Sequence, residues 1–366
     1  MRSAERALHP QPDVALAPLT TLGIGGSARW FIRASSVDDV AAAHRWADEH
    51  GVELFVLGGG SNLVIADDGF NGLVTQIDVR GVEFTRDGDD TLVRAGAGEA
   101  WDPLVAAVVS RGLAGVECLS GIPGSVGGTP VQNVGAYGQE VSDTIAHVMA
   151  FDRRLKQMVT MASEDCRFTY RMSRFKREDA GRFVVCDVVF RLRPGQATTT
   201  YPDVSRHFER HGITTPTVAD ARSAVLDIRR QKGMVIDPGD PDTRSVGSFF
   251  MNPVVPNDVH RRIAAQFPDG HTPGFTLADG SVKIPAAWLI EQAGFRKGFG
   301  NGRAGLSTKH PLAIVNRGSA TARDVLAVAV QIKRGVLDRF GIRLHPEPVF
   351  VGFGDDPDVH DLISVA

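Results

Sequence analysis

Apolar and polar positions divide the chain into three stretches with different patterns. In the first stretch, residues 20–80, three short apolar runs are typical of buried strands. These runs occupy residues 29–33, 52–56 and 72–77. Between the first two runs, Ser36 is a candidate helix N-cap, and Gly51 follows the end of the helical pattern. This strand–helix–strand order predicts a sheet that is at least partly parallel.

The second stretch, residues 81–200, is dominated by β-rich runs and has α+β character. Asp87 and Gly88 separate two of these runs and indicate a hairpin. A helix is expected over residues 101–111, just before a second glycine-rich segment. The expected strands are residues 82–85, 91–95, one on each side of a turn at 152–155, and 182–190.

The third stretch begins at Thr217, which with Asp220 forms the start of a helix that runs to about Lys232. A segment rich in Pro, Gly and Asp follows at residues 237–241, and a final strand is expected at 342–352. Further helices are expected near residues 258–266, 285–293 and 321–340. We therefore place a domain boundary near residue 217 and expect the final strand to return to an earlier domain.

Composition narrows the class of protein. At 366 residues the chain is long enough for two or three domains. It is 43% hydrophobic and 23% charged with a net charge of −3, so it lacks the basic excess typical of nucleic-acid binding. Its three cysteines form no CxxC pair, which argues against disulfides or structural zinc and favours the cytoplasm. No apolar run is long enough for a membrane span, and residues 1–12 resemble a polar tail rather than a signal peptide.

Two glycine-rich loops are the most informative motif. Gly58, Gly59 and Gly60 follow the apolar run at 52–56, and residues 121–128 form the second loop. Glycines after a strand let backbone N–H groups approach a phosphate with no Cβ in the way. Either loop alone is equally well an ordinary tight turn. Together they indicate one long anionic ligand, a dinucleotide pyrophosphate held from two sides.

Four other segments carry reactive or binding side chains, and each has a structural alternative. Residues 132–138 offer amides and a phenol to a cofactor, or form a plain turn. The arginines at 168–176 suit anion recognition, or a solvated basic face. Ser248, beside two phenylalanines, is a candidate proton donor or a structural serine. Glu347, between two prolines, is an aimed carboxylate or part of an edge strand.

Other motifs are absent or lie in the wrong context. Gly300, Gly302 and Gly305 match the spacing of a dinucleotide fingerprint, but a helix rather than a strand precedes them, so we interpret them as a loop. The sequence has no HExxH, CxxC or paired-histidine spacing, so no catalytic metal is expected. The absence of GxSxG argues against the simplest serine hydrolase.

Taken in order, these segments resemble the UDP-N-acetylenolpyruvoylglucosamine reductase family, flavin enzymes of bacterial peptidoglycan precursor synthesis. Tyr201 matches the mobile-loop tyrosine of the family's first subtype. The match covers most of the chain and includes residues 21–26, 58–62, 121–128, 132–138, 170–176, 247–253, 287–294 and 346–347. The resemblance implies an α+β fold, with a vanillyl-alcohol-oxidase-type FAD-binding fold in two subdomains and a C-terminal α+β substrate-binding domain. The implied domains are residues 1–80 with 341–366, 81–216 and 217–340.

The resemblance also implies a reaction, the NADPH-dependent reduction of UDP-N-acetylglucosamine enolpyruvate to UDP-N-acetylmuramate through bound FAD. Arg171 and Glu347 are expected to stabilise an enolate-like anion, and Ser248 to protonate C2 of the substrate. The implied cofactor-binding residues are Leu57, Gly58, Gly59, Gly60, Ser61, Asn62, Gly121, Ile122, Pro123, Gly124, Ser125, Gly127, Gly128, Asn133, Gly135, Ala136, Tyr137 and Val184. The implied substrate-binding residues are Tyr137, Tyr170, Arg171, Tyr201, Lys232, Ser248, Asn252 and His310.

Residues 57–64 contain neither His nor Cys, the residues that tether FAD in related folds, so FAD is expected to be non-covalent. His310 stands where a glutamine can occur and Val349 where a basic residue can occur, which affects contacts with substrate and NADPH. We expect a monomer without metal, nucleic acid or membrane. The alternatives are another flavin oxidoreductase or oxidase of the same fold and a non-catalytic UDP-sugar-binding protein.

Overall fold

The computed structural model describes residues 8–267 and 272–364. Backbone contacts divide the chain into two compact units. The first unit holds residues 1–15, 27–60 and 70–235, and the second holds residues 16–26, 61–69 and 236–366. Segments before residue 70 therefore contribute to both units. This two-part grouping does not test the three-domain division implied by the resemblance, which stays a prediction.

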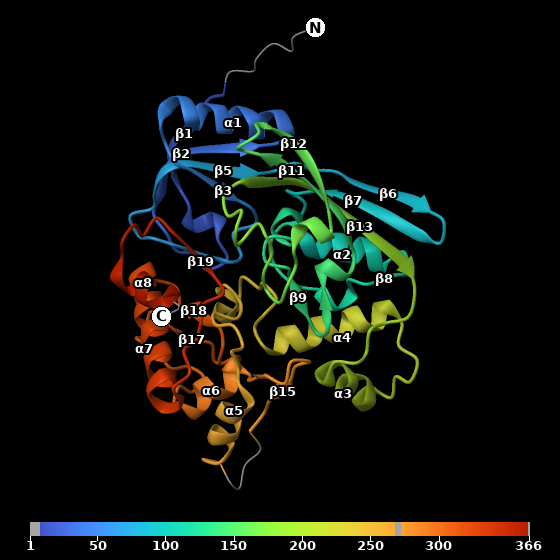
Figure 1. Cartoon of the computed structure of the whole chain (residues 1–366), viewed down its shortest axis with the longest axis vertical. Coiled ribbons are helices and arrows are strands. Elements are labelled where there is room, and N and C mark those ends of the chain that lie inside the picture. Colours follow the sequence, from blue (N-terminus) through green and yellow to red (C-terminus); the bar gives the residue numbers. More distant parts are fainter. Residues whose placement is uncertain (1–7, 268–271, 365–366) are drawn as a thin grey trace. The chain divides into compact units, whose positions relative to one another are not determined.

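The first unit contains a four-stranded sheet that includes the strands of the predicted strand–helix–strand motif (Figure 1). The strand order is β1 (Gln11–Ala15), β2 (Ser27–Ala34), β5 (Phe70–Ile77) and β3 (Leu54–Leu57). β2, β5 and β3 run parallel, whereas β1 pairs antiparallel with β2. The predicted parallel sheet is confirmed. β1 begins inside the segment expected to be a polar tail, and residues 1–7 of that tail lie outside the described residues.

Helix α1 (Val37–His50) has the ends that the sequence predicts. The hydroxyl of Ser36 accepts the N–H of Asp39 at 3.1 Å, so one of the unpaired donors of the first turn is satisfied. Gly51 ends the helix in the left-handed conformation, with φ 60°.

A second, antiparallel sheet provides six strands of the first unit. Its path is β12 (Gln157–Ala162), β11 (Ile145–Asp152), β13 (Phe183–Pro194), β7 (Asp90–Gly96) and β6 (Val82–Asp87), with β8 (Leu113–Ala114) also paired to β13. β6 and β7 form the predicted hairpin. Helix α2 (Trp101–Val109) ends before the expected Arg111, because the chain turns at Gly112 with φ 69° and the N–H of Gly112 closes on the carbonyl of Val109 at 2.9 Å.

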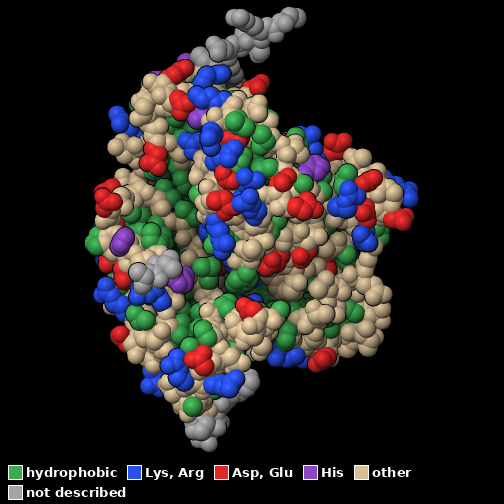
Figure 2. Space-filling model, in the orientation of Figure 1, with side chains coloured by type: hydrophobic (Ala, Val, Ile, Leu, Met, Phe, Trp, Pro, Cys, Tyr) green, Lys and Arg blue, Asp and Glu red, His purple; other side chains and the backbone are tan. Residues whose placement is uncertain are grey.

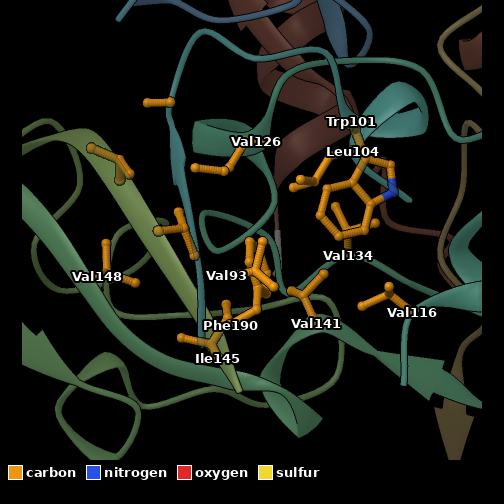
Figure 3. Close-up of a cluster of buried hydrophobic side chains, with 14 of the residues drawn as sticks. Val93, Trp101, Leu104, Val116, Val126, Val134, Val141, Ile145, Val148 and Phe190 are labelled. Atoms are coloured by element: carbon orange, nitrogen blue, oxygen red, sulfur yellow. The ribbon is translucent and has the colours of Figure 1, made fainter. Parts of the chain in front are cut away.

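The core of the first unit lies between α2 and the antiparallel sheet (Figure 3). Trp101 is 1% exposed, its ring centroid lies 5.7 Å from that of Phe190, and its indole N–H donates to the carbonyl of Leu119 at 3.0 Å. Full burial of a large aromatic side chain stabilises a fold by about 3 kcal/mol. The backbone N–H of Trp101 also donates to the carbonyl of Gly124 at 3.0 Å, so the core holds the second glycine loop in place.

Two helices and a small hairpin complete the first unit. The elements are α3 (Pro202–His211), α4 (Val218–Gln231), β9 (Gly135–Ala136) and β10 (Gln139–Glu140). α4 begins at Thr217, which shares reciprocal capping hydrogen bonds with Asp220 as predicted. The apolar face of α4, including Val225, packs against Phe208 of α3 and against Cys118. This packing places α4 in the first unit, which runs to residue 235.

The second unit is built around the long helix α7 (Ala322–Phe340), capped reciprocally by Thr321 and Asp324. Its other helices are α5 (Asn257–Ala264), α6 (Ala286–Gln292) and α8 (Pro357–Ile363), and its strands are β4 (Leu63–Ile65), β14 (Val254–Val255), β15 (Phe275–Thr276), β16 (Val282–Lys283), β17 (Ala304–Leu306), β18 (Ile314–Asn316) and β19 (Val349–Val351). The three predicted helices are confirmed, whereas α8 was not predicted. Buried Lys333 of α7 donates to the carbonyl of Leu362 at 3.0 Å and so fastens α8 to α7.

The C-terminal strand returns to the segment that follows the first glycine loop. β19 runs parallel to β4 and pairs Val349 with Leu63. The strand is shorter than the predicted range of 342–352, because Pro346 and Pro348 have no N–H to donate to a ladder. Both strands fall in the second unit, so the expected return to an earlier domain stays a prediction.

The surface carries both signs of charge. On the face shown in Figure 2, basic and acidic side chains are interspersed. Ion pairs such as Arg191 with Asp87, at 2.6 Å, and Lys156 with Asp48, at 2.9 Å, account for part of this pattern. Exposed pairs of this kind contribute about 0–1 kcal/mol each. None of the described helices combines the length and the apolar composition that crossing a bilayer requires.

Candidate active site

The two glycine-rich loops touch each other within the first unit. The N–H of Gly59 donates to the hydroxyl of Ser125 at 3.1 Å. A Cβ added at Gly59 would lie 2.6 Å from the Cα of Gly124, and one added at Gly58 would lie 2.8 Å from the Ser125 hydroxyl. Such distances are shorter than atoms of this kind tolerate, so only glycine permits the approach. The two loops therefore form one continuous backbone surface.

Some N–H groups of these loops are already used within the protein. The N–H of Gly121 donates to Asp102 at 2.6 Å, and Asp102, in the first turn of α2, also accepts from Arg222 of α4 at 2.6 Å. Among the hydrogen bonds of the described residues, none uses the N–H of Gly60 or Gly124, so both are candidate donors to a phosphate. Asp102 was missed by the sequence reasoning, although an acidic residue in the first turn of a helix beside a glycine loop is a usable signal.

A pocket of about 250 Å³ opens beside the glycine loops, and all its lining residues belong to the first unit. It is lined by Arg33, Gly58, Gly59, Gln76, Ile77, Asp78, Arg80, Gly98, Ala100, Gly124 and Ser125. Several of these residues stand at the carboxyl ends of the parallel strands, which is where open α/β sheets usually bind ligands. Arg33 and Arg80 bring two cations to this pocket, and Arg80 pairs with Asp78 at 2.5 Å.

Three predicted site residues have a strained backbone. Asn133, Tyr137 and Arg171 have φ values of 45°, 50° and 56°, in the left-handed region that disfavours side chains with a Cβ. Such a conformation costs about 1–3 kcal/mol per residue and persists where the surroundings enforce it, often at functional sites. The strain therefore supports a functional role for this part of the first unit.

The side chain of Arg171 forms a hydrogen bond with the β9–β10 hairpin. Its guanidinium donates to the carbonyl of Gly135 at 2.5 Å and lies 5.7 Å from the ring of Tyr170. Asn133 is 1% exposed, and its amide donates to Glu140 at 2.7 Å. The side chain of Asn133 thus holds the hairpin together, and its expected contact with the cofactor stays a prediction.

Tyr137, Tyr201 and Lys232 gather in one group, as the implied substrate site requires. The two tyrosine rings meet edge to face with centroids 5.3 Å apart, and the Lys232 ammonium lies 5.8 Å from the Tyr137 ring. Lys232 also pairs with Asp203 at 2.7 Å. Burial raises the pKa of both tyrosines, so both phenols are protonated and able to donate at neutral pH.

In the second unit, Phe249 joins the segment of Ser248 to that of Glu347. The N–H of Glu347 donates to the carbonyl of Phe249 at 2.9 Å, and the N–H of Phe249 donates to the carbonyl of Leu312 at 2.8 Å. Phe249 is fully buried and Ser248, the preceding residue, is half-buried. The segment of His310 is joined to the same place through Leu312. Ser248, Glu347 and His310 therefore come from three neighbouring segments of one unit.

Two asparagines fix the surroundings of this serine and glutamate. Asn62 donates to the carbonyl of Glu347 at 3.3 Å, and its own carbonyl accepts the N–H of Val349 at 3.0 Å. The side-chain oxygen of Asn252 accepts the N–H of Ala286 at 2.9 Å, so Asn252 caps α6. Asn62 thus links the end of the first glycine loop to the segment that carries the glutamate.

The remaining predicted residues lie in the framework around the loops. Leu57 is fully buried at the end of β3, and Val184 is 3% exposed in the core of the first unit. Gly127 packs against Ala97, where an added Cβ would lie 2.6 Å from the Cβ of Ala97. Ile122 and Pro123 are half-buried between the glycines of the second loop, and Ser61 falls in the second unit. Among the described residues, no three His, Cys, Asp or Glu side chains are grouped to bind a metal ion.

The sequence of the chain was compared with those of known protein families and known proteins. Residues 28–154 match the FAD binding domain model, and residues 240–351 match the C-terminal domain model of UDP-N-acetylenolpyruvoylglucosamine reductase. The chain is 48% identical over 349 residues to UDP-N-acetylenolpyruvoylglucosamine reductase of Thermobifida fusca, an alignment that covers 93% of this chain and 97% of that protein.

The chain belongs to the UDP-N-acetylenolpyruvoylglucosamine reductase family. The family protein of Mycobacterium tuberculosis is 46% identical over 94% of this chain and 96% of its own length. A crystal structure of the family protein of Thermus caldophilus superposes with a TM-score of 0.65 at 24% identity, covering 94% of this chain and 100% of that chain. The predicted family and fold class, an FAD-binding fold followed by a C-terminal reductase domain, are confirmed.

The family assignment agrees with where the site residues lie. Both glycine-rich loops fall in the residues that match the FAD binding domain. Ser248, Asn252, His310 and Glu347 fall in those that match the C-terminal domain of this reductase. The sequence therefore assigns the cofactor loops and the serine–glutamate pair to the two matched regions of the family.

Proposed function

We propose that this protein reduces UDP-N-acetylglucosamine enolpyruvate to UDP-N-acetylmuramate, with NADPH as the reductant and FAD as the bound carrier, in bacterial peptidoglycan precursor synthesis. Membership of the reductase family carries the proposal. The geometry supports it, because the chain combines a glycine surface for a pyrophosphate with a serine and a glutamate on joined segments.

The residues present fit FAD. The contact of Gly59 with Gly124 leaves bare backbone where a pyrophosphate needs N–H donors, and the adjoining pocket has arginines for an anion. We assign the pyrophosphate to the loops at residues 58–62 and 121–125, with FAD held non-covalently. Bound there, FAD would supply the hydride transfer from NADPH to C3 of the enolpyruvyl group.

The chain's own residues then stabilise the negative charge on the substrate and donate a proton to it. As hydride arrives at C3, negative charge builds on C2 and the adjoining carboxylate of the substrate. Arg171 stabilises that anion with its guanidinium, and Glu347 assists. Ser248 donates the proton to C2.

The other predicted residues hold the substrate. Lys232 supplies a cation for the diphosphate, and Tyr201 supplies an aromatic face for the uracil. Tyr137 belongs to the same group of side chains, and Tyr170 lies close enough to Tyr201 to contribute to its raised pKa. Asn252 and His310 are also assigned to substrate binding. We also assign the reaction to the cytoplasm, which the three free cysteines support, and we propose that the protein is a monomer.

The test is NADPH oxidation by the purified yellow protein with and without UDP-N-acetylglucosamine enolpyruvate. The proposal predicts rapid oxidation only when the sugar nucleotide is present, with UDP-N-acetylmuramate as the product. A colourless protein that binds UDP-sugars without turnover points instead to the binding-protein alternative. Rapid oxygen consumption with an alcohol substrate points to an oxidase of the same fold.

A further inference from the structure

Lys232 has an internal anionic partner in the first unit. Its ammonium lies 2.7 Å from Oδ2 of Asp203, and the two side chains are 37% and 26% exposed. The pair joins two helices, because Asp203 lies in the first turn of α3 and Lys232 follows the last turn of α4. Asp203 comes two positions after Tyr201, the residue expected to contact the uracil.

Asp203 also pairs with a second cation, Arg206. Its other oxygen, Oδ1, accepts from Arg206 at 2.5 Å. It also stands near the N-terminus of α3, where the helix dipole favours a negative charge. Burial raises the pKa of Asp203, but hydrogen bonds and charges from Lys232 and Arg206 outweigh it, so the pKa lies below its ordinary value. The carboxylate is therefore charged at neutral pH, and it remains paired if Lys232 leaves.

We propose that Asp203 is a positioning residue that holds Lys232 in the ligand-free enzyme as an internal substitute for the substrate's diphosphate. The inference rests on the proposed function, which gives Lys232 the diphosphate. A diphosphate that contacts the Lys232 ammonium meets the Asp203 carboxylate at the same nitrogen. Two anions compete for one cation, so the lysine must exchange partners when substrate enters, and Asp203 then relies on Arg206.

The exchange has two physical consequences. Asp203 weakens the binding of any diphosphate by the free energy of the Lys232–Asp203 pair, so its removal tightens binding. The release of Lys232 also removes a link between α3 and α4 close to Tyr201. Binding of the diphosphate is thereby coupled to the freedom of the segment that carries the tyrosine. The product retains the diphosphate, so Asp203 competes with it for Lys232 as well. This competition speeds product release and so favours turnover.

The experiment measures the dissociation constant of UDP for the FAD-loaded enzyme by calorimetry at several salt concentrations. A partly exposed ion pair of this kind contributes up to about 1 kcal/mol. Asp203→Asn is therefore expected to bind UDP about two- to fivefold more tightly than wild type. The difference is expected to shrink at high salt and to vanish when both proteins also carry Lys232→Met. Asp227→Asn, which removes a carboxylate paired with Arg230 at 3.0 Å on α4, is expected to bind UDP as wild type does.

The outcomes separate this inference from the proposed function. The flavin spectrum and the melting temperature of each variant report whether it is folded, and Asp203→Ala offers a second variant if Asp203→Asn is misfolded. If wild type binds UDP but neither Asp203 variant binds it more tightly, the inference is wrong and the proposed function stands. If tightening survives Lys232→Met, Asp203 acts by general repulsion rather than by holding the lysine. If wild type does not bind UDP, both are wrong.

Discussion

The backbone N–H of Glu347 donates to the carbonyl of Phe249 across 2.9 Å, and this bond ties the proposed glutamate to the residue after Ser248. Asn62 holds the same stretch by donating to the carbonyl of Glu347 at 3.3 Å. Residues far apart in the sequence are thus joined by one main-chain bond and by one bond from the Asn62 side-chain amide. Main-chain bonds fix the positions of neighbouring side chains, as a site that must aim a hydroxyl and a carboxylate requires.

Replacing Ser248 separates the two halves of the proposed reaction. Ser248→Ala removes the proton donor but no group that NADPH needs, so flavin reduction by NADPH is expected to proceed at the wild-type rate. Reoxidation of the flavin by the enolpyruvyl substrate is expected to slow by about 10²–10⁴-fold. Anaerobic stopped-flow absorbance measures the two steps separately. Ser319→Ala, at an exposed position of the second unit, is the control. Equal losses in both steps contradict the assigned role.

Filling the contact between the glycine loops is expected to weaken FAD binding. Gly59→Ala places a Cβ 2.6 Å from the Cα of Gly124, so one of the two loops must move. Overpacking of this kind costs about 1–3 kcal/mol, which corresponds to a loss in FAD affinity of about 5- to 150-fold. Flavin fluorescence on dilution measures the affinity. Gly239→Ala, exposed and distant in sequence, serves as the control and is expected to retain FAD. Full affinity in Gly59→Ala counts against the loops as the pyrophosphate site.

Asp102 is expected to support FAD binding without touching the cofactor. It accepts from Gly121 at 2.6 Å and from Arg222 at 2.6 Å. Asp102→Ala leaves both donors without this acceptor, and a lost charge-assisted hydrogen bond of about 1.5 kcal/mol lowers FAD affinity about tenfold. Glu49→Ala, at an exposed position of α1, controls for the loss of a carboxylate. Unchanged affinity in Asp102→Ala means that the second loop keeps its shape unaided.

The same carboxylate gives a direction for the dependence on pH. Burial raises the pKa of Asp102, but Arg222 and the N–H of Gly121 outweigh it, so the pKa lies below its ordinary value of 3.8. Because the folded-state pKa is depressed, the carboxylate stabilises the fold at pH values above about 4 and this contribution is lost as the pH falls further. FAD release during acid titration is expected in that range. A variant with Asp102→Ala is expected to have a weaker response there, and an identical acid profile contradicts the assignment.

The three cysteines are expected to be inert in the folded protein. Burial raises the pKa of Cys118 and of Cys166 to about 12 and that of Cys186 to about 11. Since the thiolate is the reactive form, a chromogenic disulfide reagent at pH 8 is expected to label none of them quickly. All three are expected to react after denaturation. Rapid labelling of the native protein means that the segments around these residues open readily.

Much of the fold follows from local signals in the sequence. Ser36 and Gly51 predict both ends of α1, and Thr217 with Asp220 predicts the start of α4, because caps and left-handed glycines act within a few residues. The unit to which α4 belongs could not be predicted in this way. That depends on its contact with Phe208 of α3, and α3 has no strong N-cap signal of its own.

The candidate site also has features that local sequence signals predict and features that depend on distant residues. The glycine loops could be predicted, because glycine itself is the signal for close backbone approach. The pairing of Asp102 with Arg222 and that of Asp203 with Lys232 could not, since each joins residues more than twenty positions apart. The Asn133 amide also donates to the carbonyl of Thr169, 36 residues away, and that contact is a product of tertiary packing. The roles of Arg171, Ser248 and Glu347 stay predictions.

The most direct test of the central claim is a single turnover without oxygen. The purified enzyme is reduced with one equivalent of NADPH and then mixed with UDP-N-acetylglucosamine enolpyruvate. The account predicts that the flavin absorbance returns in full, that one equivalent of UDP-N-acetylmuramate forms, and that Arg171→Ala and Glu347→Gln both slow this step. A flavin that stays reduced with the sugar nucleotide, yet reoxidises promptly in air, contradicts the account.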